Sequence, residues 1–437
     1  MAPAIGARMG ISLAVIGGGS TYTPELIDGF IARGDRLEVG RIVLHDVNAE
    51  RLEVVGGLAG RMLRRAAWPG TLSLTRDLGQ ALDGADFVLL QLRIGGQAAR
   101  LVDETLPPRF GTIGQETTGA GGFAKALRTV PVVLDIAAEA RRRAAPGAWI
   151  VDFTNPVGIV TQALLDDGHR ALGLCNVAIT LQRDLAQRLK VDPGRVTLEH
   201  VGLNHLSWIR SVTVDGTDRL PELLEAEGAD LAHEMDLPLD AYRRLGAIPS
   251  YYLRYYYEFD RVLAKQLTGQ NRASEVMDIE ARLLAMYRDP QLDEKPALLA
   301  DRGGAFYSEA AAQLVEGLTV GADDPQVVDL RNEGALDELA DDDVVEVPAR
   351  IGREGAHPLP QRPLPDELRQ LVLAAKRYER LAVKAARSGV RADALEALAA
   401  NPLVAGHTDP EPLLDALLDA NRDSLPAFFP PRPLANA

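Results

Sequence analysis

The sequence is short of cysteine and of positive charge. Cys175 is the only cysteine among 437 residues, so the chain cannot form an internal disulfide, which fits a reducing cytosol. Lys and Arg number 47 against 62 Asp and Glu, which gives a formal net charge of −15. A surface of that overall sign argues against nucleic acid or anionic membranes as partners, but it leaves room for a local basic pocket that takes an anionic substrate.

Long apolar runs are also missing. No run reaches the roughly 18 residues that a transmembrane helix needs, so we expect no membrane-spanning segment. Residues 1–10 lack the apolar core of a signal peptide, and we interpret them as a disordered extension. The Pro-rich residues 428–437 are expected to form an extended tail. Together with the single cysteine, these absences predict a cytoplasmic protein.

The chain is longer than one hydrophobic core usually supports, which predicts two domains. In its first part, short apolar runs alternate with amphipathic stretches. Strands are expected at residues 11–16, 41–44, 72–74, 86–92 and 148–153, and helices from residue 23 and at 51–67, 78–82 and 125–143. This alternation predicts an α/β fold, a Rossmann-like doubly wound parallel sheet, over residues 11–175.

The pattern changes after residue 171. Residues 196–201 and 207–214 predict two antiparallel strands joined by a loop that contains His205. Helices rich in acidic residues, Ala and Leu follow. After them come a tyrosine cluster at 251–257, a strand at 344–347, and amphipathic helices at 365–400 and 410–424. We therefore expect residues 176–427 to form a second, α+β domain.

A glycine-rich turn follows the first expected strand and precedes a helix. Such a turn lets backbone amides approach a pyrophosphate at a helix N-terminus, although Tyr22 stands where the usual fingerprint has its third glycine. At the end of the second expected strand, the Asp46 carboxylate can accept from a ribose hydroxyl and would repel a 2′-phosphate, which favours NAD over NADP. The alternative is a structural turn with a helix-capping aspartate. The candidate cofactor-binding residues are Gly17, Gly18, Gly19, Ser20, Thr21 and Asp46.

Cys175 and His205 form a second candidate site. A thiolate and an imidazole suit Zn, Mn, Fe or Co rather than Ca. Their spacing is not that of a zinc finger and the sequence has no CxxC motif, so we do not expect a four-ligand structural zinc site. A two-ligand site would leave open positions for substrate oxygens. On spacing alone, a buried apolar cysteine and a structural histidine are the alternative.

Several motifs occur together and in a fixed order between residue 11 and about residue 425. They are Val15-Ile16-Gly17-Gly18-Gly19-Ser20, Gly114-Gln115-Glu116-Thr117, Asp152-Phe153-Thr154-Asn155-Pro156, Cys175-Asn176-Val177 and Gly202-Leu203-Asn204-His205. With these motifs the sequence resembles glycoside hydrolase family 4. Residues 243–249 further resemble the 6-phospho-β-glucosidase branch.

The resemblance implies a glycosidase that uses NAD and a divalent metal, usually Mn²⁺. In this family, NAD⁺ takes hydride from carbon 3 of the sugar, which acidifies the proton on carbon 2. A base removes that proton, the glycosidic oxygen leaves by elimination, water adds, and NADH returns the hydride. The metal chelates oxygens on carbons 2 and 3 as a Lewis acid. Cys175 and His205 would be its protein ligands.

The resemblance also implies roles for single residues. Tyr252 matches the family's catalytic base, whose phenol needs a nearby positive charge because its ordinary pKa is about 10. Glu116 matches a position that tunes this tyrosine. Arg93 and Asn155 match substrate-contacting positions at the ends of expected strands. Arg272 matches another substrate position, and arginine suits bidentate recognition of phosphate.

Asn176 favours a β-linked substrate. The α-glucosidase relatives place an aspartate after the cysteine as a proton donor to the leaving group, and asparagine has no titratable proton. Ala178 replaces the proline usual in the β-branch, which loosens the loop but removes no chemical group. The expected substrate is a phosphorylated disaccharide or an aryl β-glucoside. The aglycone, the choice of gluco or galacto configuration, the metal used in the cell and the leaving-group acid stay open.

Other functions remain as alternatives. A glycosidase of the same family could act on an unphosphorylated, galacto or uronic sugar. A lactate/malate-type NAD dehydrogenase has the same expected architecture, but it uses a His/Asp pair without a metal. A non-catalytic NAD-sensing module would not need an intact set of metal, base and substrate positions. The resemblance implies a homodimer or homotetramer, because family members form dimers or tetramers. Residues 176–427 are expected to carry the contacts to substrate and metal and the contacts between subunits.

Overall fold

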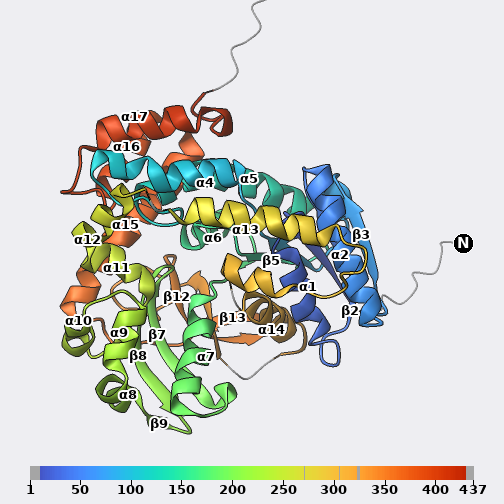
Figure 1. Ribbon diagram of the computed structural model, residues 1–437, viewed down its shortest axis with the longest axis horizontal. Coiled ribbons are helices and arrows are strands. Elements are labelled where there is room, and N and C mark those ends of the chain that lie inside the picture. Colours follow the sequence, from blue (N-terminus) through green and yellow to red (C-terminus); the bar gives the residue numbers. More distant parts are fainter. Residues whose placement is uncertain (1–9, 270, 305, 322–324, 430–437) are drawn as a thin grey trace, which may run out of the picture.

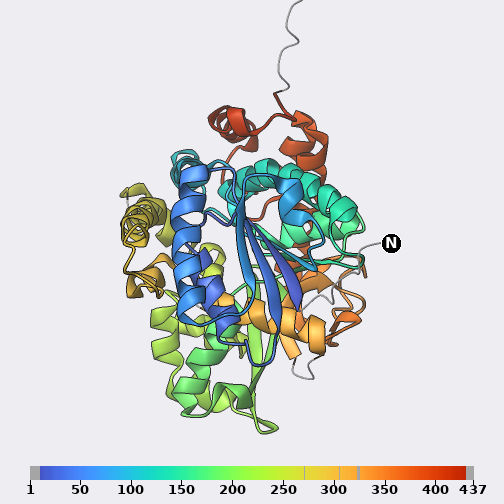
Figure 2. The ribbon, with the colours of Figure 1, turned by 90° about the vertical axis from the view of Figure 1, so that its right-hand side faces the viewer.

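The computed structural model describes residues 10–269, 271–304, 306–321 and 325–429. The extension predicted for residues 1–10 and the tail predicted for residues 428–437 lie almost entirely outside the described residues. A nine-stranded sheet with helices on both faces forms the centre, and a smaller sheet lies beside it (Figures 1 and 2). Among the described residues, none of the helices combines the length and apolar character needed to span a bilayer.

Six parallel strands make up the larger part of the main sheet. They lie in the order β6-β5-β4-β1-β2-β3, so the chain winds outward from β1 in one direction and then, from β4, in the other. This confirms the predicted doubly wound sheet. The strands are β1 (Ile11–Ile16), β2 (Val39–His45), β3 (Thr71–Thr75), β4 (Phe87–Leu90), β5 (Trp149–Asp152) and β6 (Ala171–Gly173).

Both faces of this sheet are buried. Alternate residues of β1 point to opposite sides: Leu13 and Val15 belong to one hydrophobic core, and Ala14 and Ile16 to another. This explains why the inner strands β1 and β4 are nearly continuous apolar runs, whereas β3 at the edge of the sheet alternates and is not buried. The first core is covered by α1 (Thr23–Ile31), α2 (Ala49–Arg65) and α14 (Tyr307–Val320), and the second by α3 (Leu78–Leu82), α5 (Gly119–Arg143) and α6 (Val157–Asp166).

Three strands from the C-terminal part of the chain complete the same sheet. β11 (Pro325–Arg331) pairs antiparallel with β6, and β12 (Val344–Gly352) and β13 (Gly355–Pro358) continue outward from it. The main sheet therefore contains strands from both sides of residue 175. The division into two domains, residues 11–175 and 176–427, stays a prediction.

The C-terminal helices pack over α5 and α6. The range 365–400, predicted to be helical, contains two helices, α15 (Asp366–Ser388) and α16 (Arg391–Ala400). Gly389 ends the first with a left-handed φ of 64°, and a Cβ at this position would lie 2.5 Å from the carbonyl oxygen of Ala427. α17 (Pro410–Ala420) then forms within the predicted range 410–424.

The small sheet carries the hairpin that the sequence predicts. β7 (Val196–Leu203) and β8 (Leu206–Val214) pair antiparallel, and Asn204 and His205 form the turn between them. β9 (Thr217–Asp218) and β10 (Ile248–Pro249) flank β8. The remaining helices are α4 (Gly96–Thr105), α7 (Val177–Leu189), α8 (Leu220–Ala226), α9 (Gly228–Glu234), α10 (Leu239–Leu245), α11 (Arg254–Tyr257), α12 (Phe259–Leu267) and α13 (Arg272–Tyr287).

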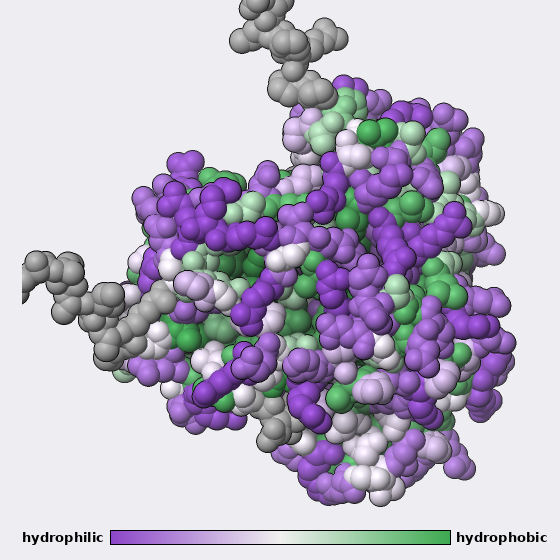
Figure 3. Space-filling view, turned by 180° about the vertical axis from the view of Figure 1, so that it is seen from behind, coloured by the Kyte–Doolittle hydropathy of each residue, from purple (hydrophilic) through white to green (hydrophobic). Residues whose placement is uncertain are grey.

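The surface seen from behind is mostly hydrophilic, with small apolar areas between charged side chains (Figure 3). Among the described residues, the large apolar side chains that are exposed come from elements far apart in the sequence, such as Val47, Leu267 and Val390. Isolated exposed apolar residues of this kind are normal for a globular protein.

A candidate active site at the carboxyl ends of the sheet strands

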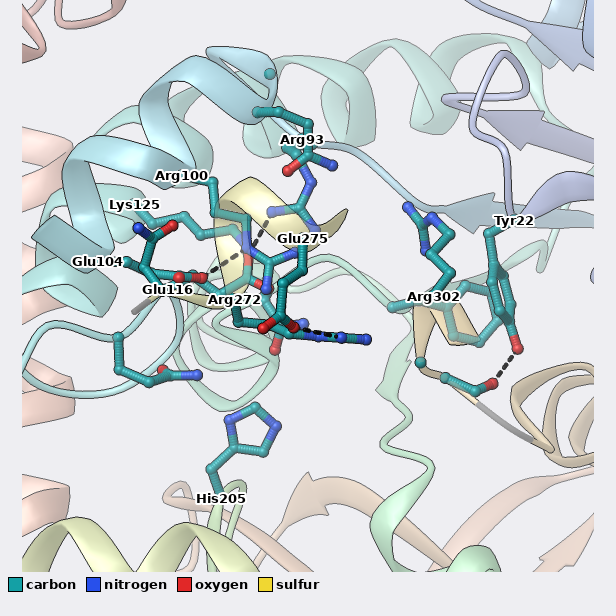
Figure 4. Close-up of a pocket in the computed structure, with 18 of the residues that line it drawn as sticks. Tyr22, Arg93, Arg100, Glu104, Glu116, Lys125, His205, Arg272, Glu275 and Arg302 are labelled. Carbon is teal, nitrogen blue, oxygen red and sulfur yellow. Dashed lines mark hydrogen bonds and ion pairs between the residues drawn. The ribbon is translucent and has the colours of Figure 1, made fainter. Parts of the chain in front are cut away.

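A cavity of about 1680 Å³ lies at the carboxyl ends of the parallel strands. Ligands bind at this edge in open α/β sheets, because the loops there diverge at the point where the strand order reverses. The cavity reaches from the glycine turn after β1 to the hairpin tip between β7 and β8 (Figure 4). Ten predicted site residues line it: Gly17, Ser20, Asp46, Arg93, Glu116, Asn155, Asn176, His205, Tyr252 and Arg272.

The glycine turn is packed tightly against β2. The amides of Gly17 and Gly18 both donate to the carbonyl oxygen of His45, at 2.9 and 2.7 Å. A Cβ on Gly18 would lie 2.8 Å from the Cβ of Leu44. Gly18 and Gly19 are thus required for close packing and do not line the cavity. Thr21 is buried away from the cavity, where its hydroxyl bonds to the Glu280 carboxylate.

Asp46 closes this turn from the end of β2. Its Oδ2 accepts from the Gly19 amide at 3.0 Å, and its Oδ1 accepts from the Asn48 amide at 2.9 Å. The cap of α2 is Asn48, which accepts from the Arg51 amide, so Asp46 is not a helix cap. The carboxylate is half-buried and borders the cavity, where its remaining lone pairs can accept from a ligand hydroxyl.

His205 and Tyr252 lie face to face at the other end of the cavity. Their ring centroids are 3.7 Å apart with an interplanar angle of 16°, and Tyr251 packs on the far side of Tyr252 at 4.0 Å. Burial lowers the pKa of His205 to about 4, so the imidazole is neutral at pH 7. Burial raises the pKa of Tyr252 well above its usual value, and the neighbouring Tyr251 and Cys175 raise it further.

Cys175 is buried just behind the cavity wall. It follows β6, and the Tyr307 hydroxyl lies beside its sulfur. Burial holds the pKa of the thiol well above its ordinary range. Cys175 belongs to the hydrophobic cluster against which Tyr252 packs, and Tyr252 stacks on His205, so the thiol and the imidazole lie at one end of the cavity.

The donor atoms at this end fit a divalent metal such as Mn²⁺. Neither ring nitrogen of His205 has a hydrogen-bond partner in the described part of the chain, and its Nδ1 is fully buried. A neutral, unpartnered imidazole beside a thiol is a suitable donor set for a transition metal. No group of three or more His, Cys, Asp or Glu side chains suited to a metal occurs among the described residues.

Glu116 is the centre of a buried charge cluster. Its carboxylate accepts from Arg93 and from Lys125 at 2.9 Å, and it forms an ion pair with Arg100 at 3.2 Å (Figure 4). Burial raises the pKa of Glu116, but the three cations outweigh it and hold the pKa well below the usual value. Burial lowers the pKa of Lys125 to about 8 against the opposing attraction of Glu116. In the described residues, Glu116 bonds to these cations and not to Tyr252, the tyrosine that the sequence analysis expected it to tune.

The remaining predicted residues border the cavity on different sides. Asn155 follows β5, and its Oδ1 is buried with no partner among the described residues. Asn176 lies directly before α7. Arg272 begins α13 at the rim, where it donates to Glu275 at 2.8 Å and to the carbonyl oxygen of Asp301 at 2.6 Å.

Sequence reasoning missed a second charge cluster around Glu280. This carboxylate of α13 is 5% exposed and accepts from Thr21, from Gln97 at 2.9 Å, from Arg302 at 3.0 Å and from Arg51 at 3.4 Å. These partners are scattered along the chain, so no local pattern marks them. Lys125 had a detectable signal, since it is the one charged residue in the otherwise small and apolar stretch 119–127.

A family model described as "Family 4 glycosyl hydrolase" matches residues 12–191, and a model of its C-terminal domain matches residues 200–404. The chain belongs to glycoside hydrolase family 4. This confirms the resemblance that the motifs of the sequence indicate.

Relatives in family 4 span almost the whole chain. A protein of Bacillus subtilis (strain 168) named "Probable 6-phospho-beta-glucosidase" is 40% identical over 96% of this chain and 98% of its own length. The 6-phospho-beta-glucosidase of Escherichia coli (strain K12) is 36% identical over 96% of this chain and 97% of its own.

Solved family-4 structures superpose closely. The 6-phospho-beta glucosidase from Thermotoga maritima, with NAD and glucose-6-phosphate, has a TM-score of 0.88 at 34% identity and covers 95% of this chain and 99% of its own. The same enzyme with manganese, NAD⁺ and glucose-6-phosphate has a TM-score of 0.87. Malate dehydrogenase from Cryptosporidium parvum, at 15% identity and a TM-score of 0.53, shares the fold alone, as the predicted dehydrogenase-like architecture requires.

Proposed function

We propose that this chain is a 6-phospho-β-glucosidase that uses NAD and a divalent metal, with Mn²⁺ as the first candidate. The observation that carries the proposal is one cavity that joins the glycine turn and Asp46 to the His205–Tyr252 stack, with Arg93 and Arg272 along its walls. Relatives named for this activity, at 36–40% identity over nearly the full chain, support the choice of a β-linked phosphosugar.

The two ends of the cavity would bind different groups. Gly17, Ser20 and Asp46 would hold NAD, which accepts hydride from carbon 3 of the sugar and later returns it. Cys175 and His205 would hold the metal, which serves as a Lewis acid toward oxygens on carbons 2 and 3. The neutral imidazole is ready to bind a cation, whereas the thiol must first lose its proton.

Tyr252 would act as the base that takes the proton from carbon 2. Because burial raises the pKa of its phenol, the hydroxyl is protonated at neutral pH unless a positive charge lies beside it. The stack on His205 holds the ring against the proposed metal ligand, so the same contact that positions the hydroxyl also brings it near that charge.

The basic side chains would recognise the phosphate. Arg93 is already held by Glu116, so its remaining N–H groups keep a fixed direction into the cavity. Arg272 lies half-exposed at the rim and would have to exchange its bond to Glu275 for a phosphate oxygen. Asn155 and Asn176, which border the same cavity, would contact sugar hydroxyls, and the buried Oδ1 of Asn155 would then gain a donor.

The test is release of p-nitrophenol from p-nitrophenyl β-glucoside 6-phosphate after chelation, with Mn²⁺ and NAD⁺ restored singly and together. We expect release only with both additions and no net NADH. Unphosphorylated, α-linked and galacto analogues run beside it, and cleavage of one of these alone would move the substrate within the family. No release from any of them with both cofactors present would refute the proposal.

Two variants test the assignment of the base. Tyr252→Phe should lower kcat by about 10²-fold or more, since general-base catalysis contributes on that scale. Tyr256→Phe is the matched control, because Tyr256 belongs to the same tyrosine cluster but does not line the cavity. Equal activity of the two variants would show that Tyr252 is not the base.

The predicted domain roles and oligomeric state belong to the same proposal. Residues 11–175 would bind NAD, and residues 176–427 would supply His205, Tyr252 and Arg272 together with subunit contacts. We expect a homodimer or homotetramer. Sedimentation equilibrium of the purified protein checks this, and a mass equal to one chain of 47.1 kDa would contradict it.

A further inference from the structure

A row of buried acidic side chains crosses the sheet behind the proposed metal ligands. Asp152 on β5 and Asp329 on β11 flank Gly173 of β6, and Glu346 on β12 is the cross-strand partner of Asp329. The three acids are at most 1% exposed. Of the three, only Glu346 has both carboxylate oxygens bonded to side chains of the small sheet. The row therefore reaches the hairpin that carries His205 through Glu346.

Glu346 links two residues of that hairpin. Its Oε1 lies 2.7 Å from the Nε2 of His200 on β7, and its Oε2 accepts from the Nδ2 of Asn204 at 2.9 Å. His200 and Glu346 are essentially inaccessible to solvent. A buried carboxylate with two side-chain donors in the same hairpin is held in one orientation, and it holds the hairpin in turn.

The turn needs such support. His205 has a φ of 62°, in the left-handed region that residues other than glycine seldom adopt. A histidine that binds a metal is usually oriented by a hydrogen bond from its second ring nitrogen. His205 has none in the described residues. Its ring is instead oriented by its backbone and by the stack on Tyr252.

We infer that Glu346 is a positioning residue for His205 and acts through the side chain of Asn204. The inference rests on the proposed metal site at Cys175 and His205. Asn204 directly precedes His205, so the bond from its side chain to Glu346 ties the left-handed turn to the main sheet. Through this bond, a strand of the C-terminal segment fixes a ligand that belongs to the small sheet.

The experiment is a double-mutant cycle on Mn²⁺ binding. Metal-free protein without NAD or substrate is titrated with Mn²⁺ by isothermal calorimetry for the parent, Asn204→Ala, Glu346→Ala and the double variant. We expect each single change to weaken binding about tenfold, the lower end for groups that orient metal ligands. Since both single changes remove the hydrogen bond between Asn204 and Glu346, the double variant should bind Mn²⁺ about as weakly as the single variant with the lower affinity.

Asn332→Ala is the matched control for a general loss of stability. Asn332 is a fully buried asparagine whose side-chain amide bonds to backbone carbonyls after β11, outside the hairpin and the cavity lining. This variant should melt at a lower temperature and yet bind Mn²⁺ like the parent. If it loses affinity as Asn204→Ala does, the effect is not positioning and the inference is overturned.

The remaining outcomes separate this inference from the proposed function. A parent that does not bind Mn²⁺ refutes the metal site itself. A parent that binds, with Asn204→Ala binding equally well, refutes only the role of Glu346. Asn204→Ala changes a turn side chain, so it gives an answer even if Glu346→Ala does not fold. Additive losses in the double variant would show that the two residues act separately.

Discussion

Replacing Glu116 by glutamine tests the charge cluster in the cavity wall. Glutamine has nearly the same shape, but it removes the negative charge that faces Arg93, Arg100 and Lys125. The side chain of Glu116 is 12% exposed and that of Lys125 is 2% exposed, so water cannot replace the lost charge. Breaking a buried ion pair from one side costs about 3–5 kcal/mol, and we expect a loss of unfolding free energy in that range at pH 6.5.

The unfolding free energy that Glu116→Gln removes should depend on pH because of Lys125. Burial already lowers its pKa from 10.5 to about 8, which corresponds to a cost of about 3 kcal/mol when the lysine is charged in the folded state. The folded state then binds fewer protons than the unfolded state between pH 8 and 10.5, so stability rises with pH in this window. Without Glu116 the pKa falls further, and the window opens below pH 8.

Urea denaturation followed by circular dichroism at pH 6.5 and pH 9 measures both effects. At pH 9 Lys125 is largely neutral in parent and variant, so the loss caused by Glu116→Gln should shrink by about 1 kcal/mol or more. In a Lys125→Met background the loss should no longer change with pH. A loss below about 1 kcal/mol at pH 6.5, or equal losses at both pH values, would refute this reasoning.

Three further changes test other parts of the structure. Gly18→Ala places a Cβ 2.8 Å from that of Leu44, so it should lower the free energy of unfolding in urea by about 1–3 kcal/mol. NAD binding, measured by fluorescence, should also weaken, and unchanged values of both would contradict the tight turn. Burial and the neighbouring Glu346 raise the pKa of Asp329, so the free energy of unfolding should fall as pH rises above the ordinary range of a carboxyl group. Asp329→Asn should flatten that fall in urea denaturation, and an unchanged fall would contradict the shift. Glu280→Gln should lower the free energy of unfolding in urea by about 2 kcal/mol. This is less than the loss for a fully buried ion pair, because the arginine partners of Glu280 are partly exposed. A loss near zero would argue against the cluster.

Elements that obey the usual sequence patterns were predicted closely. β1 was predicted with its observed bounds because a run that is apolar except for Ser12 ends at glycines. The predicted range 78–82 also matches α3, which the side chain of Asp77 caps. The hairpin β7–β8 was predicted because two β-branched, apolar runs flank a polar turn. In each case the local pattern and the final packing agree.

Elements with buried charge were not predicted. α4 begins at Gly96, directly after Gly95, and both glycines have left-handed φ; the helix turns Arg100, Asp103 and Glu104 toward the interior. This inverts the polar-outside pattern by which a helix is recognised. β11 was missed because Asp329 lies in the middle of the strand, fully buried, where a strand of the core normally has an apolar residue.

The candidate site divides in the same way. Residues within motifs, such as His205 and Tyr252, could be found because the motif itself marks them. The Glu280 cluster joins segments up to 259 residues apart, and the link from Asn204 to Glu346 joins segments 142 residues apart. Such contacts exist only after the sheet has formed, so no local pattern in a single sequence predicts them.

The position of β11 also has a consequence for synthesis on the ribosome. β6 pairs with β5 on one side and with β11 on the other, and the end of β11 follows Gly173 by about 160 residues. At about 5–20 residues per second, the open edge of β6 persists for on the order of 10–30 s in each nascent chain. An unpaired strand edge is a template for association between chains, so a fragment ending before residue 325 should aggregate, and the full chain should gain yield from chaperones that bind early.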